Sequence, residues 1–261
     1  MTDWTVTRLA PALGAVVDGV DLARATNDHL DLLAGLLDAH QVLVLPGQAA
    51  MTPTAHVRVG AAFGDPFIHP FLTAIDDDPA ILEVLKSATD TETFGGEHWH
   101  CDISFTNPPA AVSVLHGIEI PSLGGDTLFA DTVGAYRRLS KPIRDLLDGL
   151  TATHVYPGMV EGPDTSAVHP VVRRHPRTGR SSLYVNAAFV DRINELERAE
   201  SDALLAFLYA HQTRPEFQVR IGWEPDQVLI WDNRTTVHYA MNDYPGQRRR
   251  LQRVTSIERP S

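Results

Sequence analysis

Hydrophobic residues along the chain recur mainly in short runs with the period of β-strands, and turn residues separate these runs. Nine strands are predicted in this way, at 81–85, 99–105, 111–120, 127–130, 171–174, 182–186, 217–221, 228–231 and 250–257. A tenth, at 41–45, ends at Pro46-Gly47. The sequence Pro176-Arg177-Thr178-Gly179 predicts a hairpin turn between two of the strands. Many short strands joined by turns are typical of β-sandwiches and barrels.

Helical periodicity is confined to a few segments. A helix is expected to begin with Asn27 as its cap, because leucines at 30, 33, 36 and 37 then share one face. Thr52-Pro53 has the pattern of a cap followed by the first helical residue. Thr132 and Ser140 are further candidate caps, and 195–212 is a longer amphipathic helix. The pattern predicts a mainly β protein with flanking helices, a double-stranded β-helix (jelly roll, cupin-like) formed by one domain over 1–261.

The candidate chemistry begins with His100-Cys101-Asp102, inside the strand expected at 99–105. Alternate side chains of a strand point to the same face, so His100 and Asp102 are expected to project together. His238, far downstream, can complete a set of two imidazoles and one carboxylate. Such a set, with the opposite side open, suits a non-haem Fe(II) that must also hold a co-substrate and dioxygen.

Near the C-terminus a basic strand supplies candidate anion-binding groups. Arg249, Leu251 and Arg253 share one face of this strand, so two guanidinium groups lie at neighbouring depths. Each can bind an oxyanion through paired hydrogen bonds. One arginine is expected to hold the distal carboxylate of a 2-oxo diacid, and the other an anionic substrate. Arg248 and Arg250, on the opposite face, are expected to be solvated or paired with acidic residues.

Several motifs in a fixed order connect these candidates. They are Trp99-His100-Cys101-Asp102, Gly124-Gly125-Asp126-Thr127-Leu128, Tyr184-Val185-Asn186 with Phe189, Pro215-Glu216-Phe217-Gln218-Val219-Arg220, and Trp231-Asp232-Asn233-Arg234 through Arg253. On these motifs, which span nearly the whole chain, the sequence resembles the TauD/TfdA family of Fe(II)/2-oxoglutarate-dependent dioxygenases, and the taurine dioxygenases within it.

The resemblance implies a role for each matching residue. The iron ligands, which are also the catalytic residues, would be His100, Asp102 and His238. Thr127 and Arg249 would bind the 2-oxoglutarate carboxylate, with Trp231 lining the same pocket. The substrate's anionic group would contact His69 and Arg253, and its carbon body would contact Ile103 and Phe189. For His69 a plain loop histidine is an equally good interpretation.

The same resemblance predicts an enzyme that uses Fe(II), 2-oxoglutarate and O2 to hydroxylate a C–H bond of a small organic anion, releasing succinate and CO2. Two positions depart from the taurine pattern, because Gly96 and Leu72 stand where taurine dioxygenase has polar partners. The segment between His154 and His169 is also shorter than its counterpart, which forms part of a lid. An alkyl or aryl sulfonate, a sulfate ester or a carboxylate is therefore expected in preference to taurine. The alternatives are a natural-product tailoring hydroxylase of the same family and a non-catalytic jelly roll that senses a metal or an anion.

Composition narrows the range of partners. The formal net charge is −11, which argues against nucleic acid, and no apolar run is long enough to cross a bilayer. The single cysteine fits a reducing cytoplasm, and the first residues lack a secretory pattern. A small anionic molecule is the expected partner. The family resemblance adds the expectation of a homodimer or tetramer.

Other histidines and the cysteine have simpler interpretations. His100 itself can be a core histidine with Asp102 as a strand-end cap, a reading that the downstream motifs disfavour. His98 is expected to support His100 without binding metal. Cys101 alternates away from the proposed metal and is expected to be a small buried residue. Five further histidines are expected to be structural or exposed, namely His116, His154, His169, His175 and His211.

Overall fold

The main structural unit is a large β-sheet that carries most of the residues of interest. The computed structural model describes residues 3–70, 72, 74–75, 78–92, 98–159 and 165–259. Within these residues the sheet has nine strands in the order β1-β2-β3-β15-β7-β17-β6-β5, with β4 paired to β17. The strands are β1 (Thr5–Arg8), β2 (Ala15–Asp18), β3 (Val42–Leu45), β4 (Asp65–Pro66), β5 (Ala74–Ile75), β6 (Asp78–Lys86), β7 (Ala110–Glu119), β15 (Val228–Asp232) and β17 (Arg249–Ile257).

A smaller sheet faces one side of the large one. It has the order β14-β8-β16, formed by Gln218–Ile221, Thr127–Asp131 and Thr236–Ala240 respectively. Its inward residues Phe129 and Val219 pack with Leu229, Trp231 and Leu251 of the large sheet in one buried hydrophobic cluster. Two sheets enclosing a core in this way form the jelly-roll fold that the sequence predicts.

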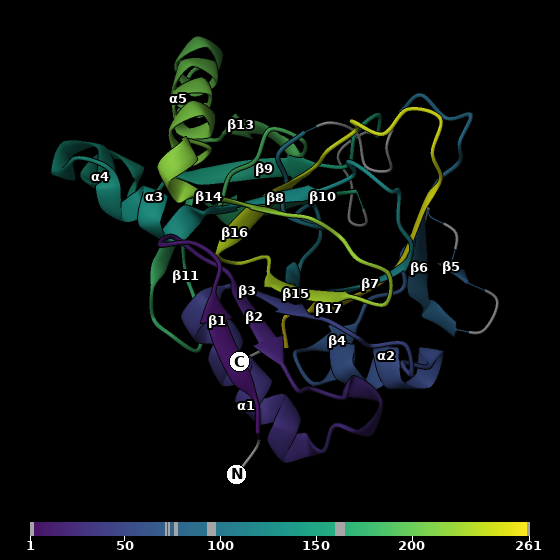
Figure 1. Ribbon diagram of the computed structural model, residues 1–261. Coiled ribbons are helices and arrows are strands. Elements are labelled where there is room, and N and C mark those ends of the chain that lie inside the picture. Colours follow the sequence, from purple (N-terminus) through teal and green to yellow (C-terminus); the bar gives the residue numbers. More distant parts are fainter. Residues whose placement is uncertain are drawn as a thin grey trace.

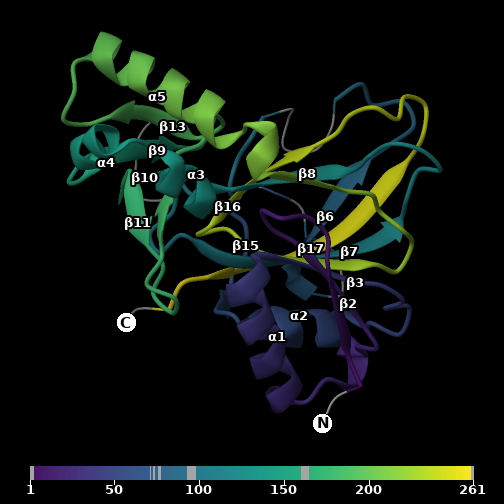
Figure 2. The ribbon, with the colours of Figure 1, turned by 60° about the vertical axis from the view of Figure 1, so that its left-hand side comes forward.

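Two helices cover the opposite face of the large sheet, α1 (Asn27–His40) and α2 (Pro53–Ala61) (Figures 1 and 2). Leu33 and Val59 of these helices are fully buried against Val114 and Ile230 of the sheet. The cap of α1 is Thr26 and not the predicted Asn27, because the Thr26 hydroxyl accepts the His29 N–H. Thr52 caps α2, followed by Pro53, as predicted.

The remaining elements form a layer beside the jelly roll, where α5 lies over the sheet that contains β9 (Figure 2). They comprise the sheet β10-β9-β13 (Ser166–Pro170, Thr151–Val155, Val190–Ile193), the hairpin β11-β12 (Val172–Arg174, Ser181–Leu183), α3 (Thr132–Arg138), α4 (Lys141–Leu147), α5 (Arg198–Gln212) and a short 3-10 helix at Pro215–Phe217. A second 3-10 helix, Leu22–Arg24, lies instead against α2, where Leu22 is buried. The hairpin joins its strands through 176–179, which confirms the predicted turn. Asp131, one residue before the predicted Thr132, caps α3.

One predicted strand is wrong. Residues 101–105 form a turn, and only His100 makes an isolated bridge, to His238. The backbone of Ile103 has φ 37°, a conformation that a strand does not adopt. Eight strands were not predicted as such: β1, β2, β4, β5, β9, β10, β13 and β16. Among the described residues, no helix has the length and apolar character needed to span a membrane.

Candidate active site

Residues from both sheets converge on one cavity of about 420 Å³ between them. All ten residues predicted for the site line it, namely His69, His100, Asp102, Ile103, Thr127, Phe189, Trp231, His238, Arg249 and Arg253. They come from strands β8, β15, β16 and β17 and from the loops around residues 69, 100 and 189. The fold therefore brings together side chains that are up to 184 positions apart in sequence, from residue 69 to residue 253.

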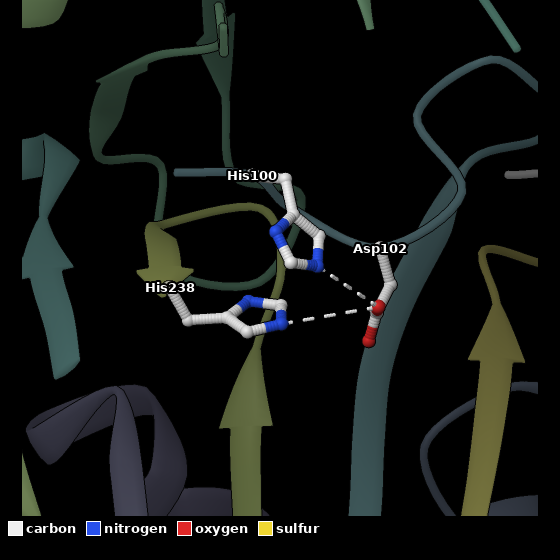
Figure 3. A group of neighbouring side chains, drawn as sticks. All are labelled: His100, Asp102 and His238. Carbon is white, nitrogen blue, oxygen red and sulfur yellow. Dashed lines mark ion pairs between the residues drawn. The ribbon is translucent and has the colours of Figure 1, made fainter. Parts of the chain in front are cut away.

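The His100, Asp102 and His238 side chains point toward a common point (Figure 3). The Nε2 atom of each imidazole lies 3.9 Å from Asp102 Oδ1. Two ligands that each bind one ion at about 2.1 Å lie at most about 4.2 Å apart, so both separations fit a shared ion. The ligand atoms of all three residues lie within 4.8 Å of one another. Two imidazoles and one carboxylate are the donor set that suits Fe(II).

The turn after His100 produces this convergence, and strand alternation does not. The backbones of His100 and His238 pair through two hydrogen bonds, of 2.9 and 2.7 Å, which fix the two histidines side by side. The chain then turns, so that Asp102 faces both rings from the other side. The three predicted ligands thus converge, but through a turn and not through the predicted strand alternation.

The protonation states of the two imidazoles favour metal binding. Burial lowers the pKa of His100 and that of His238, so both rings are neutral at physiological pH. The His100 Nδ1 atom lies 2.8 Å from the His98 carbonyl oxygen, which requires the ring proton on Nδ1 and leaves the Nε2 lone pair free. His98 thus supports His100 through its backbone. The His238 ring is held by Trp231 and Phe129, with centroids 5.0 and 5.8 Å away.

Both carboxylate oxygens of Asp102 have polar partners. Burial raises the pKa of this carboxyl group, but Arg253, the two imidazoles and the Ser113 hydroxyl outweigh burial and hold the pKa below its ordinary value. Arg253 Nη1 lies 2.5 Å from Asp102 Oδ1. Sequence reasoning did not find this ion pair, because nothing in the spacing of residues 102 and 253 indicates that they meet. The carboxylate is therefore ionised and available as a ligand.

Arg249 is a buried cation with room for an anion. Its side chain is 4% exposed, and burial lowers the pKa of its guanidinium group. Tyr244 and Asp126 lie near it and partly offset this lowering of the pKa, and its buried Nε has no hydrogen-bond partner among the described residues. Gly125 has φ 73°, and a Cβ at this position would lie 3.2 Å from Arg249 Cδ. The glycine turn therefore leaves room for the arginine, and the buried charge fits a carboxylate ligand.

Thr127 lies in the same part of the cavity with its hydroxyl oriented by a tryptophan. Trp223 Nε1 donates to Thr127 Oγ1 at 3.0 Å, and an indole N–H is a donor only. The Thr127 proton is therefore free to donate to an anion. The Arg249 guanidinium also lies over the Trp223 ring, 5.5 Å from its centroid. Trp223 was missed in the sequence, because a single tryptophan after a strand cannot be distinguished there from a core residue.

The other end of the cavity has aromatic walls. Phe189, Phe105 and Tyr156 pack edge to face, with centroids 5.2 and 4.9 Å from Phe105. The His69 ring lies 6.0 Å from that of Tyr156, and burial together with Arg253 lowers the pKa of His69 to about 4. His69 is therefore neutral and can offer a hydrogen bond but no charge. Phe105 and Tyr156 were not predicted, because aromatic residues in such runs are usually core.

The residues expected to be structural fall outside the cavity. Cys101 is buried, as predicted. His154, His169, His175 and His211 are also buried and hydrogen-bonded, for example His175 to Asp232 at 2.9 Å. Arg248 and Arg250 pair with Glu119 and Glu83 on the opposite face of β17, which confirms the predicted alternation. Leu72 lines the cavity, whereas Gly96 lies outside the described residues.

A jelly roll with a candidate His-Asp-His metal site, the buried Arg249 and the partly buried Arg253 is typical of non-haem metal oxygenases. Residues 5–255 match the family model described as taurine catabolism dioxygenase TauD, TfdA family, and the chain belongs to this family. The protein is thus a non-haem Fe(II)/2-oxoglutarate-dependent dioxygenase, with O2 as the other co-substrate.

Characterised relatives cover nearly the whole chain. An alpha-ketoglutarate-dependent sulfonate dioxygenase of Saccharomyces cerevisiae is 34% identical over 98% of this chain and 67% of its own. An alpha-ketoglutarate-dependent sulfate ester dioxygenase of Pseudomonas putida is 34% identical over 95% of this chain and 87% of its own. Pentalenolactone F synthase of Streptomyces arenae is 33% identical, over 94% and 92% respectively. The crystal structure of a taurine dioxygenase from Burkholderia xenovorans superposes with a TM-score of 0.85 at 34% identity, over 98% of this chain and 90% of that one.

Proposed function

We propose that this protein hydroxylates a C–H bond of a small organic anion, an alkyl or aryl sulfonate or a sulfate ester, and releases succinate and CO2. The observation that carries the proposal is that one cavity is lined by the His-Asp-His set, by the buried Arg249 and by Arg253, whose side chain is 11% exposed. The reaction requires sites for a metal, a dicarboxylate co-substrate and an anionic substrate. Arg249 and Arg253 provide one cationic group for each of the two anions.

In this proposal His100, Asp102 and His238 bind Fe(II). When bound, the ion supplies the activation of O2 that couples oxidative decarboxylation of 2-oxoglutarate to insertion of oxygen into the substrate. The protein groups position the co-substrate. Arg249 and the Thr127 hydroxyl bind its distal carboxylate, since both have unused donors in a buried pocket. Trp231, whose side chain is fully buried, forms the wall beside them.

Arg253 and His69 are proposed to bind the anionic group of the substrate. Arg253 uses Nη1 for Asp102, and its buried Nε has no hydrogen-bond partner. A substrate oxyanion can satisfy this donor while a neutral His69 adds a hydrogen bond. Ile103 and Phe189 contact the carbon body. Anchoring the anion to Arg253, which also contacts Asp102, places the neighbouring carbon close to the metal site.

The walls of the cavity favour a substrate larger and less polar than taurine. Leu72, Phe105, Tyr156 and Phe189 line this end, and none of them offers a charge to an ammonium group. The sulfonate and sulfate ester dioxygenases among the relatives support the anionic head group. Hydroxylation of the carbon next to a sulfonate or an ester oxygen gives an unstable product, which expels sulfite or sulfate.

A natural-product carboxylate is the second candidate, and the similarity to pentalenolactone F synthase favours it. The two candidates are separated by measuring succinate formed from 2-oxoglutarate under air with Fe(II). The compounds tested are alkyl and aryl sulfonates, sulfate esters, aryloxy acids and terpenoid carboxylates. We expect sulfonates or sulfate esters to stimulate turnover most and to release sulfite or sulfate stoichiometrically. Stimulation by the carboxylates alone would contradict the proposed substrate class.

A further inference from the structure

A chain of four buried polar groups extends from Asp102 into the large sheet. Ser113 Oγ lies 2.6 Å from Asp102 Oδ2, and Asn233 Nδ2 lies 2.9 Å from Ser113 Oγ. Asn233 Oδ1 accepts two N–H groups at 3.0 Å each, from the Asp102 backbone and from Trp231 Nε1. Each of the four residues is 2% exposed or less. Neither Ser113 nor Asn233 lines the cavity, so neither contacts a ligand there.

The direction of every hydrogen bond in this chain is determined. A backbone N–H and an indole N–H can only donate, so the Asn233 oxygen must face them and its amide nitrogen must face Ser113. An amide nitrogen also only donates, so Ser113 Oγ accepts from Asn233. Ser113 Oγ also lies 3.4 Å from Thr255 Oγ1, where either hydroxyl can donate. An ionised carboxylate only accepts, so the short contact of 2.6 Å assigns the single Ser113 hydroxyl proton to Asp102 Oδ2.

The sheet register fixes the positions of these residues. Ser113 on β7 is directly paired with Trp231 on β15 and with Thr255 on β17. Asn233 lies two residues beyond Trp231, where its backbone N–H donates to the Ala111 carbonyl oxygen. The chain is thus built on the central strands of the large sheet, whereas Asp102 itself lies in a turn. A ligand on a turn needs this external support to keep one orientation.

We propose that Ser113 and Asn233 are positioning residues that restrict Asp102 to binding the metal through Oδ1 alone. This inference rests on the proposed function, because it takes Asp102 as a ligand. Oδ2 is engaged by the Ser113 hydroxyl, and Oδ1 faces both imidazoles at 3.9 Å. A carboxylate oxygen has two lone pairs, so Oδ1 can accept from Arg253 and still bind a cation. A carboxylate held by one oxygen leaves the coordination positions that 2-oxoglutarate and O2 require.

A substitution that removes the Ser113 hydroxyl, or turns its proton away from Asp102, removes this restriction. The Asp102 carboxylate is then free to rotate and to place both oxygens toward the ion. Its second oxygen would occupy a coordination position that a co-substrate needs. Removing the partner of a ligating carboxylate typically costs roughly 10- to 100-fold in metal affinity or activity. The specific expectation is a changed metal–oxoglutarate complex and oxidation of 2-oxoglutarate without matching oxidation of substrate.

The test compares Ser113→Ala, Asn233→Asp and a matched control, Ser201→Ala. Ser201 is a fully buried serine of α5 whose hydroxyl accepts one backbone N–H, so the control removes an equivalent hydroxyl far from the site. Asn233→Asp keeps the acceptor for both N–H groups and nearly the same shape. It places an acceptor against Ser113, which directs the hydroxyl proton away from Asp102. Asn233→Asp therefore serves as a second variant with which to test the proposal if Ser113→Ala fails to fold.

Three measurements are made on each folded variant: Mn(II) affinity by calorimetry, the visible absorption of the anaerobic Fe(II)–2-oxoglutarate complex, and succinate formed per substrate oxidised. We expect both site variants to bind Mn(II) roughly 10- to 100-fold more weakly. Their visible band should be shifted or weakened, with excess succinate, and the control should match the wild type. Site variants that match the control while the wild type binds metal would overturn the positioning role alone. A wild type that binds neither ion would overturn the ligand assignment and this inference together.

Discussion

Replacing Arg249 by alanine tests the assignment of the co-substrate site. Arg249 is 4% exposed and its buried Nε has no hydrogen-bond partner in the described part of the chain, so a carboxylate bound there is removed from water and depends on this guanidinium group. Removing one partner of such a buried pair costs about 2–5 kcal/mol. At about 1.4 kcal/mol for each factor of ten, the affinity for 2-oxoglutarate should fall roughly 30- to 4,000-fold.

The assay is an anaerobic titration of the Fe(II)-loaded protein with 2-oxoglutarate, followed by its visible absorption. A second titration uses 2-oxobutyrate, which lacks the distal carboxylate. The wild type should bind 2-oxoglutarate much more tightly than 2-oxobutyrate. Arg249→Ala should lose most of this preference, because the group expected to bind the distal carboxylate is removed. Arg253→Ala is the matched control on the same strand. It removes an ion-pair partner of Asp102, but it should keep the preference for 2-oxoglutarate over 2-oxobutyrate while losing stimulation of succinate formation by substrate. An unchanged 2-oxoglutarate affinity in Arg249→Ala, or equal losses in both variants, would refute the assignment.

Two further substitutions test the stability of the fold and the substrate selectivity of the cavity. Burial raises the pKa of Asp232, but Arg234 and His175 outweigh it and hold the pKa well below its ordinary value of 3.8. The carboxylate therefore stabilises the fold above about pH 4, and this contribution is lost as the pH falls below it. Asp232→Asn should lower the free energy of unfolding by about 3–5 kcal/mol at pH 7, and the difference from the wild type should shrink in acid; a urea titration at each pH measures it. Leu72→Tyr adds a hydroxyl to the cavity wall and should raise the turnover of taurine relative to a long alkyl sulfonate, whereas an unchanged ratio in a competition assay would show that this position does not select the substrate.

Much of the site was predictable because its chemistry lies in residue types that are rare in combination. Two guanidinium groups on one strand face and an H-x-D followed by a distant histidine identified five cavity residues, and the family resemblance supplied the other five. The partners of these residues were not predictable. The Asp102–Arg253 ion pair and the Ser113–Asn233 chain join positions that only the sheet register brings together. A serine in a strand and an asparagine in a turn give no signal of their own.

Several strands were predicted wrongly or missed in the sequence. Residues 101–105 alternate between apolar and polar side chains as a strand does, yet they form a turn, because Ile103 adopts a left-handed conformation. Strands such as β1 and β13 were missed for the opposite reason: β1 is exposed along its whole length and β13 is only half-buried, so neither shows alternation. The single domain, the oligomeric state and the cytoplasmic location stay predictions.

The central claim is that His100, Asp102 and His238 bind one Fe(II) together with 2-oxoglutarate. Anaerobic addition of Fe(II) and 2-oxoglutarate tests it most directly, because the ternary complex absorbs weakly in the visible range. We predict this band in the wild type, and its loss in each of His100→Ala, Asp102→Ala and His238→Ala when circular dichroism shows that the variant is folded. A folded variant of any of the three that keeps the full band would contradict the claim.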